Sequence, residues 1–317
     1  MIKLLTKEAP QLPLKLKLDH EMSDIKISDD ELPGLYQTAN TASINEQKKY
    51  FYGIQWYLIL LIIAALVAYF AQFYETAIIR LLSAVLFLSS LGIMIWLRYD
   101  KPDDIWYNGR AVAESVKTRA WRWMMRAEPY LNSEDIQSVR GQLLNDLKKM
   151  LDQNESLIGR LGISASIVEP ITEKMIEVRK QELEDRFKIY RRERITDQEL
   201  WYSKKAKENK NKASFWFKVT VILHSLAIFA LLYNIMEPEL TLPIEVIAVA
   251  ATSVLTWFQA KKHNELASSY SLTLHEIVII KSEVTDINNE SEFSEYVMNC
   301  ENAFSREHTQ WYARKSN

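Results

Sequence analysis

Glycine and cysteine are scarce in this sequence. Seven glycines occur in 317 residues, none lies beyond Gly162, and Cys300 is the only cysteine. Glycine supplies the positive φ angles of tight β-hairpin turns and phosphate-binding loops, so the chain has few residues from which to build them. A lone cysteine cannot form an intramolecular disulfide and does not indicate an oxidising compartment. The scarcity of glycine favours a mostly helical protein.

The sequence also lacks an excess of positive charge and the motifs of known catalytic sites. Its formal net charge is −2, from 39 Lys and Arg against 41 Asp and Glu. This excludes a globally basic nucleic-acid binder but leaves local basic patches possible. No zinc-spaced Cys/His set, Walker loop, nucleophile elbow or dinucleotide fingerprint occurs, and the five histidines are scattered singly. We therefore expect no catalytic residues, no metal site, no bound cofactor and no enzyme activity.

Four segments are almost free of charge. Residues 54–73 contain no Lys, Arg, Asp or Glu, and as a helix they would be about 30 Å long, the thickness of a hydrocarbon core. Residues 77–97 follow after three residues, so the two must form an antiparallel hairpin. Residues 215–233 and 242–258 form a second, less apolar pair. Buried core helices are the alternative, but apolar ones are usually shorter. The pattern predicts an all-α membrane protein with two transmembrane hairpins, or four spans.

Lysine and arginine are absent from both hairpin loops, residues 74–76 and 234–241, and abundant on the other flanks of the spans. Loops rich in Lys and Arg stay in the cytoplasm. The distribution therefore predicts that residues 98–214 and both termini are cytoplasmic.

The two hairpins are spaced as a repeat. Ile54 and Phe215 begin them, Trp96 and Trp257 end them, and both pairs are 161 residues apart. This spacing predicts a duplicated unit of a lead-in helix, a hairpin and long cytoplasmic helices that pack as a bundle. We divide the chain into an N-terminal arm, a first unit and a second unit, covering residues 1–44, 45–160 and 165–317.

Helix boundaries follow from breakers and caps. A helix should begin near Lys101 and end at Ala127, before Pro129, and the next should run from Asn132 to about Asn154. Residues 171–236 contain neither Gly nor Pro, so they form either one long helix or two that break near Thr196 and Asp197. A last helix is expected from about Glu292 to Arg314, and residues 12–19 alternate like a strand.

Ionisable residues within the predicted spans are candidates for a pore. His224 lies mid-span, where such groups are rare and tend to face a partner or a cavity. Glu245 lies near the outer end of the last span, beside Glu237 and Glu239 of the loop, and in an oligomer these could form acidic rings that favour cations. An interhelical hydrogen bond for His224 and a solvated outer loop for the acids are the alternatives. We take His224 and Glu245 as candidate pore-lining residues.

Residues 106–130 interleave basic and aromatic side chains. Arg119, Arg122 and Arg126 fall at i, i+3 and i+7 on one helical stripe. Basic groups among aromatic faces suit a phosphodiester ligand with stackable bases and suit an anionic lipid surface nearly as well. The alternative is a solvated helix face with aromatics in the core. The candidate nucleotide or oligonucleotide contacts are Arg110, Lys117, Arg119, Arg122 and Arg126.

The hairpin followed by WYNGRAVAESVKTRAWRWMMRAEPY resembles the SLATT family, two-transmembrane effector domains associated with bacterial nucleotide-signalling and stress-sensing operons. Two copies, at about residues 20–160 and 165–315, resemble a tandem SLATT arrangement, which is similar to the membrane effector of the Hailong anti-phage system. The second copy matches by layout more than by residues. The first copy matches at Trp106, Tyr107, Arg110, Ala113, Glu114, Lys117, Ala120, Trp121, Arg122, Arg126 and Ala127.

The resemblance implies a membrane effector of anti-phage defence in the bacterial inner membrane. Such proteins are thought to form a homo-oligomeric pore, for example a tetramer, that depolarises the cell when it opens. A partner nucleotidyltransferase would make the nucleotide or oligonucleotide that controls it. A membrane-anchored scaffold or sensor without a pore is the alternative.

Overall fold

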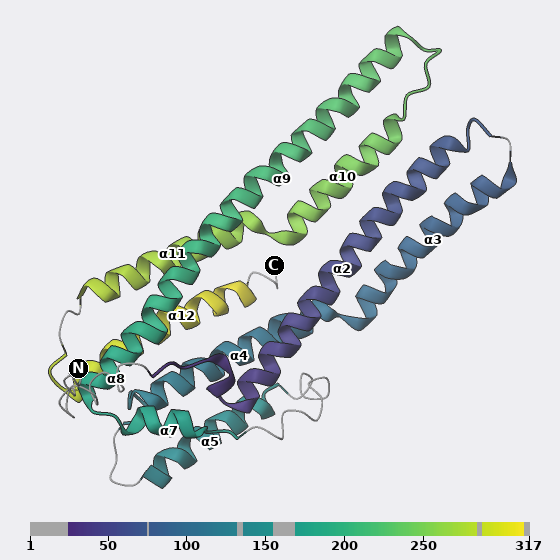
Figure 1. Cartoon of the computed structure of the whole chain (residues 1–317). Coiled ribbons are helices and arrows are strands. Elements are labelled where there is room, and N and C mark those ends of the chain that lie inside the picture. Colours follow the sequence, from purple (N-terminus) through teal and green to yellow (C-terminus); the bar gives the residue numbers. More distant parts are fainter. Residues whose placement is uncertain (1–24, 75, 132–135, 155–168, 284–286, 314–317) are drawn as a thin grey trace, which may run out of the picture.

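Two helical hairpins project in the same direction from one charged helical body (Figure 1). The computed structural model describes residues 25–74, 76–131, 136–154, 169–283 and 287–313, and every regular element in these ranges is helical. The predicted strand at residues 12–19 lies outside them. The hairpins are α2 (Gly34–Phe70) with α3 (Ala77–Asp100), and α9 (Asp197–Met236) with α10 (Ile244–Lys261).

The charged body contains the remaining helices and the N-terminal parts of α2 and α9. A single 3₁₀ turn, Asp29–Glu31, precedes α2. The helices of the body are α4 (Pro102–Met124), α5 (Ile136–Asp152), α7 (Glu173–Lys180), α8 (Leu183–Ile189), the π-helical segment η3 (Tyr190–Thr196), α11 (His263–Glu283) and α12 (Glu290–Ala313).

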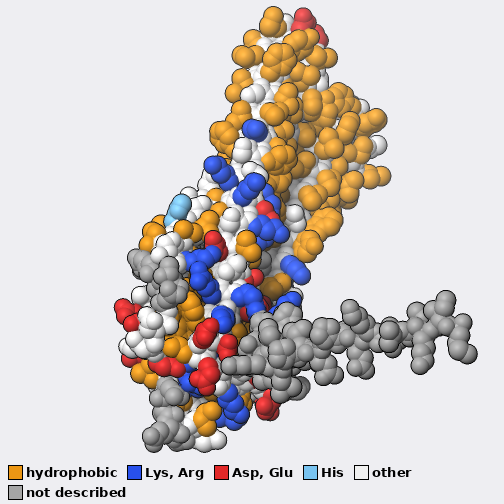
Figure 2. All heavy atoms as spheres, turned by 60° about the vertical axis from the view of Figure 1, so that its left-hand side comes forward, with side chains coloured by type: hydrophobic (Ala, Val, Ile, Leu, Met, Phe, Trp, Pro, Cys, Tyr) orange, Lys and Arg blue, Asp and Glu red, His pale blue; other side chains and the backbone are white. Residues whose placement is uncertain are grey.

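The hairpins expose apolar side chains over most of their surface. Ile78 is 76 % exposed, Phe229 67 % and Met236 78 %, so the hairpins are not core helices of this chain. Figure 2 shows the apolar surface giving way to a band of Lys and Arg, and then to mixed charge over the body. Within the described residues, three helical stretches contain a segment long and apolar enough to cross a membrane, namely Gly34–Phe70, Ala77–Met124 (which includes the left-handed residue Lys101) and Leu183–Met236.

The backbone repeats with the offset seen in the sequence. Lys101 lies between α3 and α4 with φ 48°, and Lys262, 161 residues later, lies between α10 and α11 with the same φ. One left-handed residue at each place redirects the chain between two helices. In both units the following helix then packs against the hairpin's first helix, α4 against α2 and α11 against α9.

Three helix boundaries differ from those expected. The first helix of the body ends at Met124 and not at Ala127, because Arg126 adopts a left-handed conformation with φ 54°. Residues 171–236 do break, but at Gln181 and Glu182, whose ψ angles are 156° and 162°. At Thr196 and Asp197 the helix continues, as a π-helical segment that leads into α9. Side chains distant in the sequence cause the first difference, as described below.

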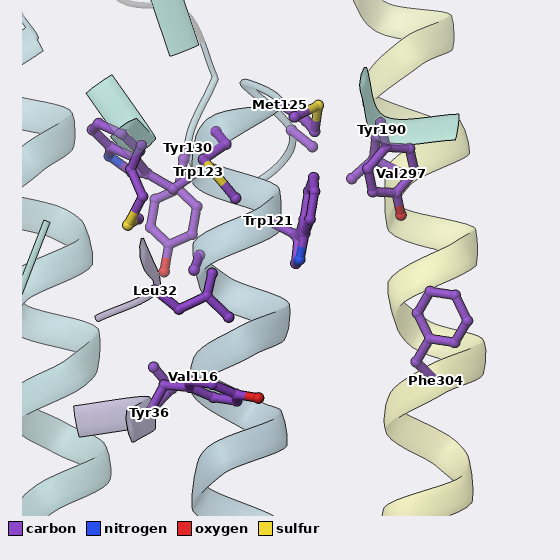
Figure 3. Packing of buried hydrophobic residues seen from close by; sticks show 14 of the residues in the cluster. Leu32, Tyr36, Val116, Trp121, Trp123, Met125, Tyr130, Tyr190, Val297 and Phe304 are labelled. Atoms are coloured by element: carbon purple, nitrogen blue, oxygen red, sulfur yellow. The ribbon is translucent and has the colours of Figure 1, made fainter. Parts of the chain in front are cut away.

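The core of the charged body is shared by both halves of the chain. Trp121 of α4 is buried on the side that faces Tyr190 of η3 and Phe304 of α12, and Trp123 is buried on the opposite side of α4, near Tyr130 (Figure 3). The rings of Trp121 and Tyr190 meet edge to face with their centroids 5.7 Å apart. Burying large aromatic side chains is among the strongest stabilising contributions available to a fold. The two units therefore depend on a common core.

Candidate ligand pocket between the two units

A cavity of about 660 Å³ lies between the two units, at the end of the body where α2 begins. The 3₁₀ turn, α2 and α4 of the first unit form one wall, and η3 with the start of α9 forms the other. The lining side chains used below are Asp29, Tyr36, Asn40, Arg110, Glu114, Lys117, Trp121, Arg192, Glu193, Arg194, Asp197, Trp201 and Tyr202.

The charges of this inter-unit pocket are balanced. Four acidic residues and four basic residues line it, so the formal charge of the lining is zero. Arg110 pairs with Glu114 at 2.7 Å, and Lys117 pairs with Asp29 at 2.8 Å. Partial burial acts to raise the pKa of Asp29, but the positive charge of Lys117 and the hydrogen bonds from Lys117 and Tyr36 together outweigh it and hold that pKa below its ordinary value. These two ion pairs fix the side chains of the first wall, formed by the 3₁₀ turn, α2 and α4, before any ligand binds.

Two buried donors of the wall have no hydrogen-bond acceptor. Trp121 is 2 % exposed, Arg194 is 1 % exposed, and both line the pocket. The indole Nε1 of Trp121 and the guanidinium Nη1 of Arg194 find no partner among the described residues. A buried donor left without an acceptor costs roughly 1–3 kcal/mol. An acceptor on a bound ligand would recover part of that cost after a small shift of these side chains.

The π-helical segment supplies part of the second wall. Its wider turn is visible in the hydrogen bond of 2.8 Å that the Thr196 hydroxyl donates to the carbonyl of Arg191, five residues earlier. Segments of π-helix are rare and occur frequently at functional sites. This one places Arg192, Glu193 and Arg194 at the pocket. No Gly or Pro marks it, so the sequence contains no local signal for it.

Comparison with known protein families identifies both units. Residues 33–187 match the model of the SMODS and SLOG-associating 2TM effector domain 3, and residues 190–311 match that of the SMODS and SLOG-associating 2TM effector domain 1. The chain belongs to the SLATT family and contains two SLATT domains in tandem. No curated protein and no solved structure matches it. The two SLATT matches meet where η3 begins, so the pocket lies between the two domains.

The five predicted anion contacts have different surroundings. Arg110 and Lys117 of the first SLATT domain line the inter-domain pocket. Arg119 lies 3.6 Å from Asp146 of α5. Buried Arg122 donates a hydrogen bond of 2.7 Å to Asn302 of α12, and burial lowers its pKa. Arg126 donates a bond of 2.9 Å to the carbonyl of Arg179.

Two arginines of the second half hold the end of α4. Arg186 donates a bond of 2.7 Å to the carbonyl of Met125, and Arg179 donates to the carbonyls of Trp123 and Tyr130. Cations stabilise the negative end of a helix dipole, and these bonds satisfy carbonyls that a terminating helix leaves free. They explain why α4 stops at Met124, before the position predicted from Pro129.

The two predicted pore residues lie on the surface of the second hairpin. His224 lies on α9 in the middle of the predicted span 215–233, and its Nδ1 lies 2.8 Å from the carbonyl oxygen of Thr220. Glu245 is exposed in the first turn of α10. Neither residue lines the inter-domain pocket. Within the described residues no group of three His, Cys, Asp or Glu side chains gathers as a metal site.

Proposed function

We propose that this tandem SLATT protein is a homo-oligomeric, non-enzymatic channel of the bacterial inner membrane, acting in anti-phage defence. A nucleotide or oligonucleotide made by a partner nucleotidyltransferase would bind the inter-domain pocket and control the pore. The family description as 2TM effector domains supports the membrane and effector parts of this proposal. The apolar hairpins support the same parts.

A fourth span is part of the proposal. The helix α10 has 18 residues, which corresponds to about 27 Å, and Leu242 and Pro243 lengthen the apolar segment. It packs along α9 as α3 packs along α2. With no Lys or Arg in either hairpin loop, the charge distribution supports a common cytoplasmic side for the body and both termini.

The observation that carries the proposal is the continuity of two helices. Tyr36 and Asn40 of α2 line the pocket, and the same helix continues to Phe70 in the first hairpin. On the other wall, the helical stretch Leu183–Met236 continues from η3 into the second hairpin. A ligand that binds one relative position of the two domains better than another would therefore bias the hairpins directly.

The pore would lie between subunits. Two hairpins in one chain pack helix against helix and enclose no conduit, so a symmetric ring of several chains is required. In that ring His224 and Glu245 are our candidate pore-lining residues. Glu237 and Glu239, both exposed in the outer loop, would add acidic rings that favour cations.

Ion flux through proteoliposomes tests the proposal. Purified protein should release a trapped ion, and the rate should change when candidate nucleotides or short oligonucleotides are added. Lys117→Gln should weaken this response, because Lys117 lines the pocket. The control Lys149→Gln should not, because Lys149 is 64 % exposed on α5. Oligomers that pass no ions with or without nucleotides would leave the protein a membrane-anchored scaffold or sensor.

A further inference from the structure

A second cavity, of about 410 Å³, adjoins the inter-domain pocket and shares Ile44, Arg110 and Trp201 with it. It lies where the hairpins join the charged body, and we call it the junction pocket. Its other polar and aromatic lining side chains are Ser43, Gln47, Phe51, Trp106, Tyr107, Lys205, Lys212, Lys261, Lys262, His263 and Tyr270.

The lining of the junction pocket is strongly positive. It contains one arginine, four lysines and no Asp or Glu, whereas the lining of the inter-domain pocket has no net charge. Arg110 is neutralised by Glu114 at 2.7 Å, and Lys205 by Glu208 at 3.2 Å. Within the described residues, no carboxylate lies within 4.0 Å of the remaining lysines, Lys212, Lys261 and Lys262.

Lys261 is the most constrained of these cations. Its Nζ lies 3.3 Å from the centroid of the Phe51 ring and 4.5 Å from that of Trp257. Burial, together with the positive charge of Lys212, lowers the pKa of Lys261 to about 8. The ring contacts compensate only part of this cost. An anion in the cavity would be attracted by charges that the protein itself does not neutralise.

The backbone fixes these lysines at the junction. Lys262 is the left-handed residue between α10 and α11. The next residue, His263, is buried with its Nδ1 2.8 Å from the side-chain oxygen of Asn209 on α9. This contact holds the start of α11 against α9. Lys212 precedes the predicted span 215–233 by three residues, and Lys261 follows the span 242–258 by three. In the proposed topology the pocket lies at the depth of lipid phosphates.

Flat aromatic walls complete the junction pocket. The rings of Trp106 and Tyr107 stack at 4.6 Å, and those of Trp201 and Tyr270 meet edge to face at 5.2 Å. Cavities of about 300–1,000 Å³ hold small organic ligands. This one is large enough for a phosphate group and the polar group attached to it.

We propose that the junction pocket binds a phosphate group, with Lys212, Lys261 and Lys262 as its charged contacts. Two molecules could carry that phosphate to this depth, an anionic phospholipid of the inner leaflet or a soluble nucleotide. The lipid source is independent of the proposed channel. The nucleotide source rests on it, because the controlling nucleotide of the adjoining inter-domain pocket would then place a phosphate group in the junction pocket.

The test uses the full chain in lipid nanodiscs and measures binding without ion flux, so that its failure differs from failure of the channel. In phosphatidylcholine discs, adenosine monophosphate is titrated against the intrinsic tryptophan fluorescence of the protein, to which Trp106 and Trp201 at the pocket contribute. In discs that contain phosphatidylglycerol, native mass spectrometry counts the retained anionic lipid. At least one probe should bind, and the double variant Lys212→Gln/Lys261→Gln should weaken that binding about tenfold or more.

Two other lysines of α9, the helix that carries Lys212, provide the matched control. Lys207 and Lys210 are exposed and do not line the pocket, so Lys207→Gln/Lys210→Gln should bind as the unaltered protein does. Retention of phosphatidylglycerol alone identifies the lipid source, and binding of the nucleotide alone identifies the soluble source. Binding of both means that the phosphate is the recognised group. Binding of neither probe, or equal weakening in the two double variants, would overturn the proposal.

Thermal unfolding distinguishes a variant that has lost the binding site from one that has misfolded. Lys261→Gln removes a half-buried, unpaired charge, so without ligand it should melt at the same or a higher temperature than the unaltered protein. The bound probe should raise the melting temperature of the unaltered protein and not that of Lys261→Gln. An equal rise in both would remove Lys261 from the site.

Discussion

Arg194 and Glu301 form a buried, two-point ion pair between η3 and α12. The Nε and Nη2 atoms of Arg194 lie 2.9 Å and 2.8 Å from the two carboxylate oxygens, and neither side chain is more than 1 % exposed. The hydroxyl of Tyr190 donates a further bond of 3.1 Å to Glu301. One wall of the inter-domain pocket is therefore locked to the C-terminal helix.

Glu301→Gln should destabilise the protein strongly. The substitution leaves Arg194 charged, buried and without a counterion, which typically costs about 3–5 kcal/mol of the free energy of unfolding. Denaturant unfolding in detergent, followed by circular dichroism, measures this loss. The control is Glu199→Gln, which breaks the half-exposed pair of Glu199 with Lys281 at 2.5 Å and should cost about 1 kcal/mol or less. Similar losses of unfolding free energy in both variants would show that burial of the Arg194–Glu301 pair does not determine its contribution to stability.

Gly109→Val should separate α2 from α4. A Cβ atom at Gly109 would lie 3.1 Å from the carbonyl oxygen of Ala39 and 3.3 Å from the Cβ of Ser43. Backbone atoms cannot turn aside as a side chain can, so we expect a loss of about 1–3 kcal/mol in the free energy of unfolding. Gly141→Val is the matched control, because nothing lies within 4 Å of that position. An undiminished melting temperature for Gly109→Val would argue against close contact of the helices.

Phosphate binding at the junction pocket should weaken in alkaline solution. The charged groups that line the pocket around Lys261 are Lys205 and Lys212 of α9, Arg110 of α4 and the adjoining Lys262, and the neighbouring His263 is a further titratable group whose pKa burial lowers. The pKa of Lys261 is lowered to about 8 in the free protein, and a bound anion favours the charged form and raises it. Binding therefore takes up a proton above pH 8, and affinity should fall about tenfold between pH 7 and pH 9. Lys261→Gln should abolish this dependence, and a flat profile in the unaltered protein would refute it.

Cysteine labelling tests the number of spans. Cys300 is buried, and burial raises the pKa of its thiol to about 12, so it should react slowly. Thr76→Cys and Glu239→Cys, one in each hairpin loop, should both react with an impermeant maleimide added to intact cells. Ser115→Cys, exposed on α4, should react only after permeabilisation. Labelling of Thr76→Cys without Glu239→Cys would show that the second hairpin does not cross the membrane.

His224→Leu should change single-channel conductance through the proposed pore. The substitution replaces a polar side chain in the middle of the predicted span 215–233 by an apolar one of similar size. Planar-bilayer recording makes the measurement, with the neighbouring Ile222→Leu as a control that exchanges one apolar side chain for another. Conductance that is the same in both variants would remove His224 from the pore.

The helical class, both hairpins and the 161-residue repeat could be predicted from the sequence because their signals are local. Apolar length identifies a hairpin, and Pro102 marks the start of α4. The end of α4 could not be predicted, because Arg179 and Arg186 that hold it are more than 50 residues away. The π-helical segment has no local signal in the sequence, so the part of the pocket wall that it forms could not be predicted either.

The predicted basic stripe also shows that a local pattern does not predict contacts with distant parts of the chain. Its spacing correctly places Arg119 and Arg122 on one helix, but Arg126 lies beyond the end of α4 with φ 54°, and helical periodicity does not reveal what faces these side chains. Asp146, Asn302 and the carbonyl of Arg179 come from three other parts of the chain. The sequence pattern identifies the lysines of the junction pocket only as residues that flank the spans. Their convergence with α4 at one cavity depends on how the two domains pack.

The left-handed lysine that recurs at the base of each hairpin gives both domains the same backbone plan within a single polypeptide. Covalent fusion fixes their ratio at one to one, however many copies assemble. Two separate, identical domains would face each other with identical walls. In a fused pair the two facing walls can differ. One domain can then supply aromatic rings and paired charges, while the other supplies lysine amines that have no ion-pair partner.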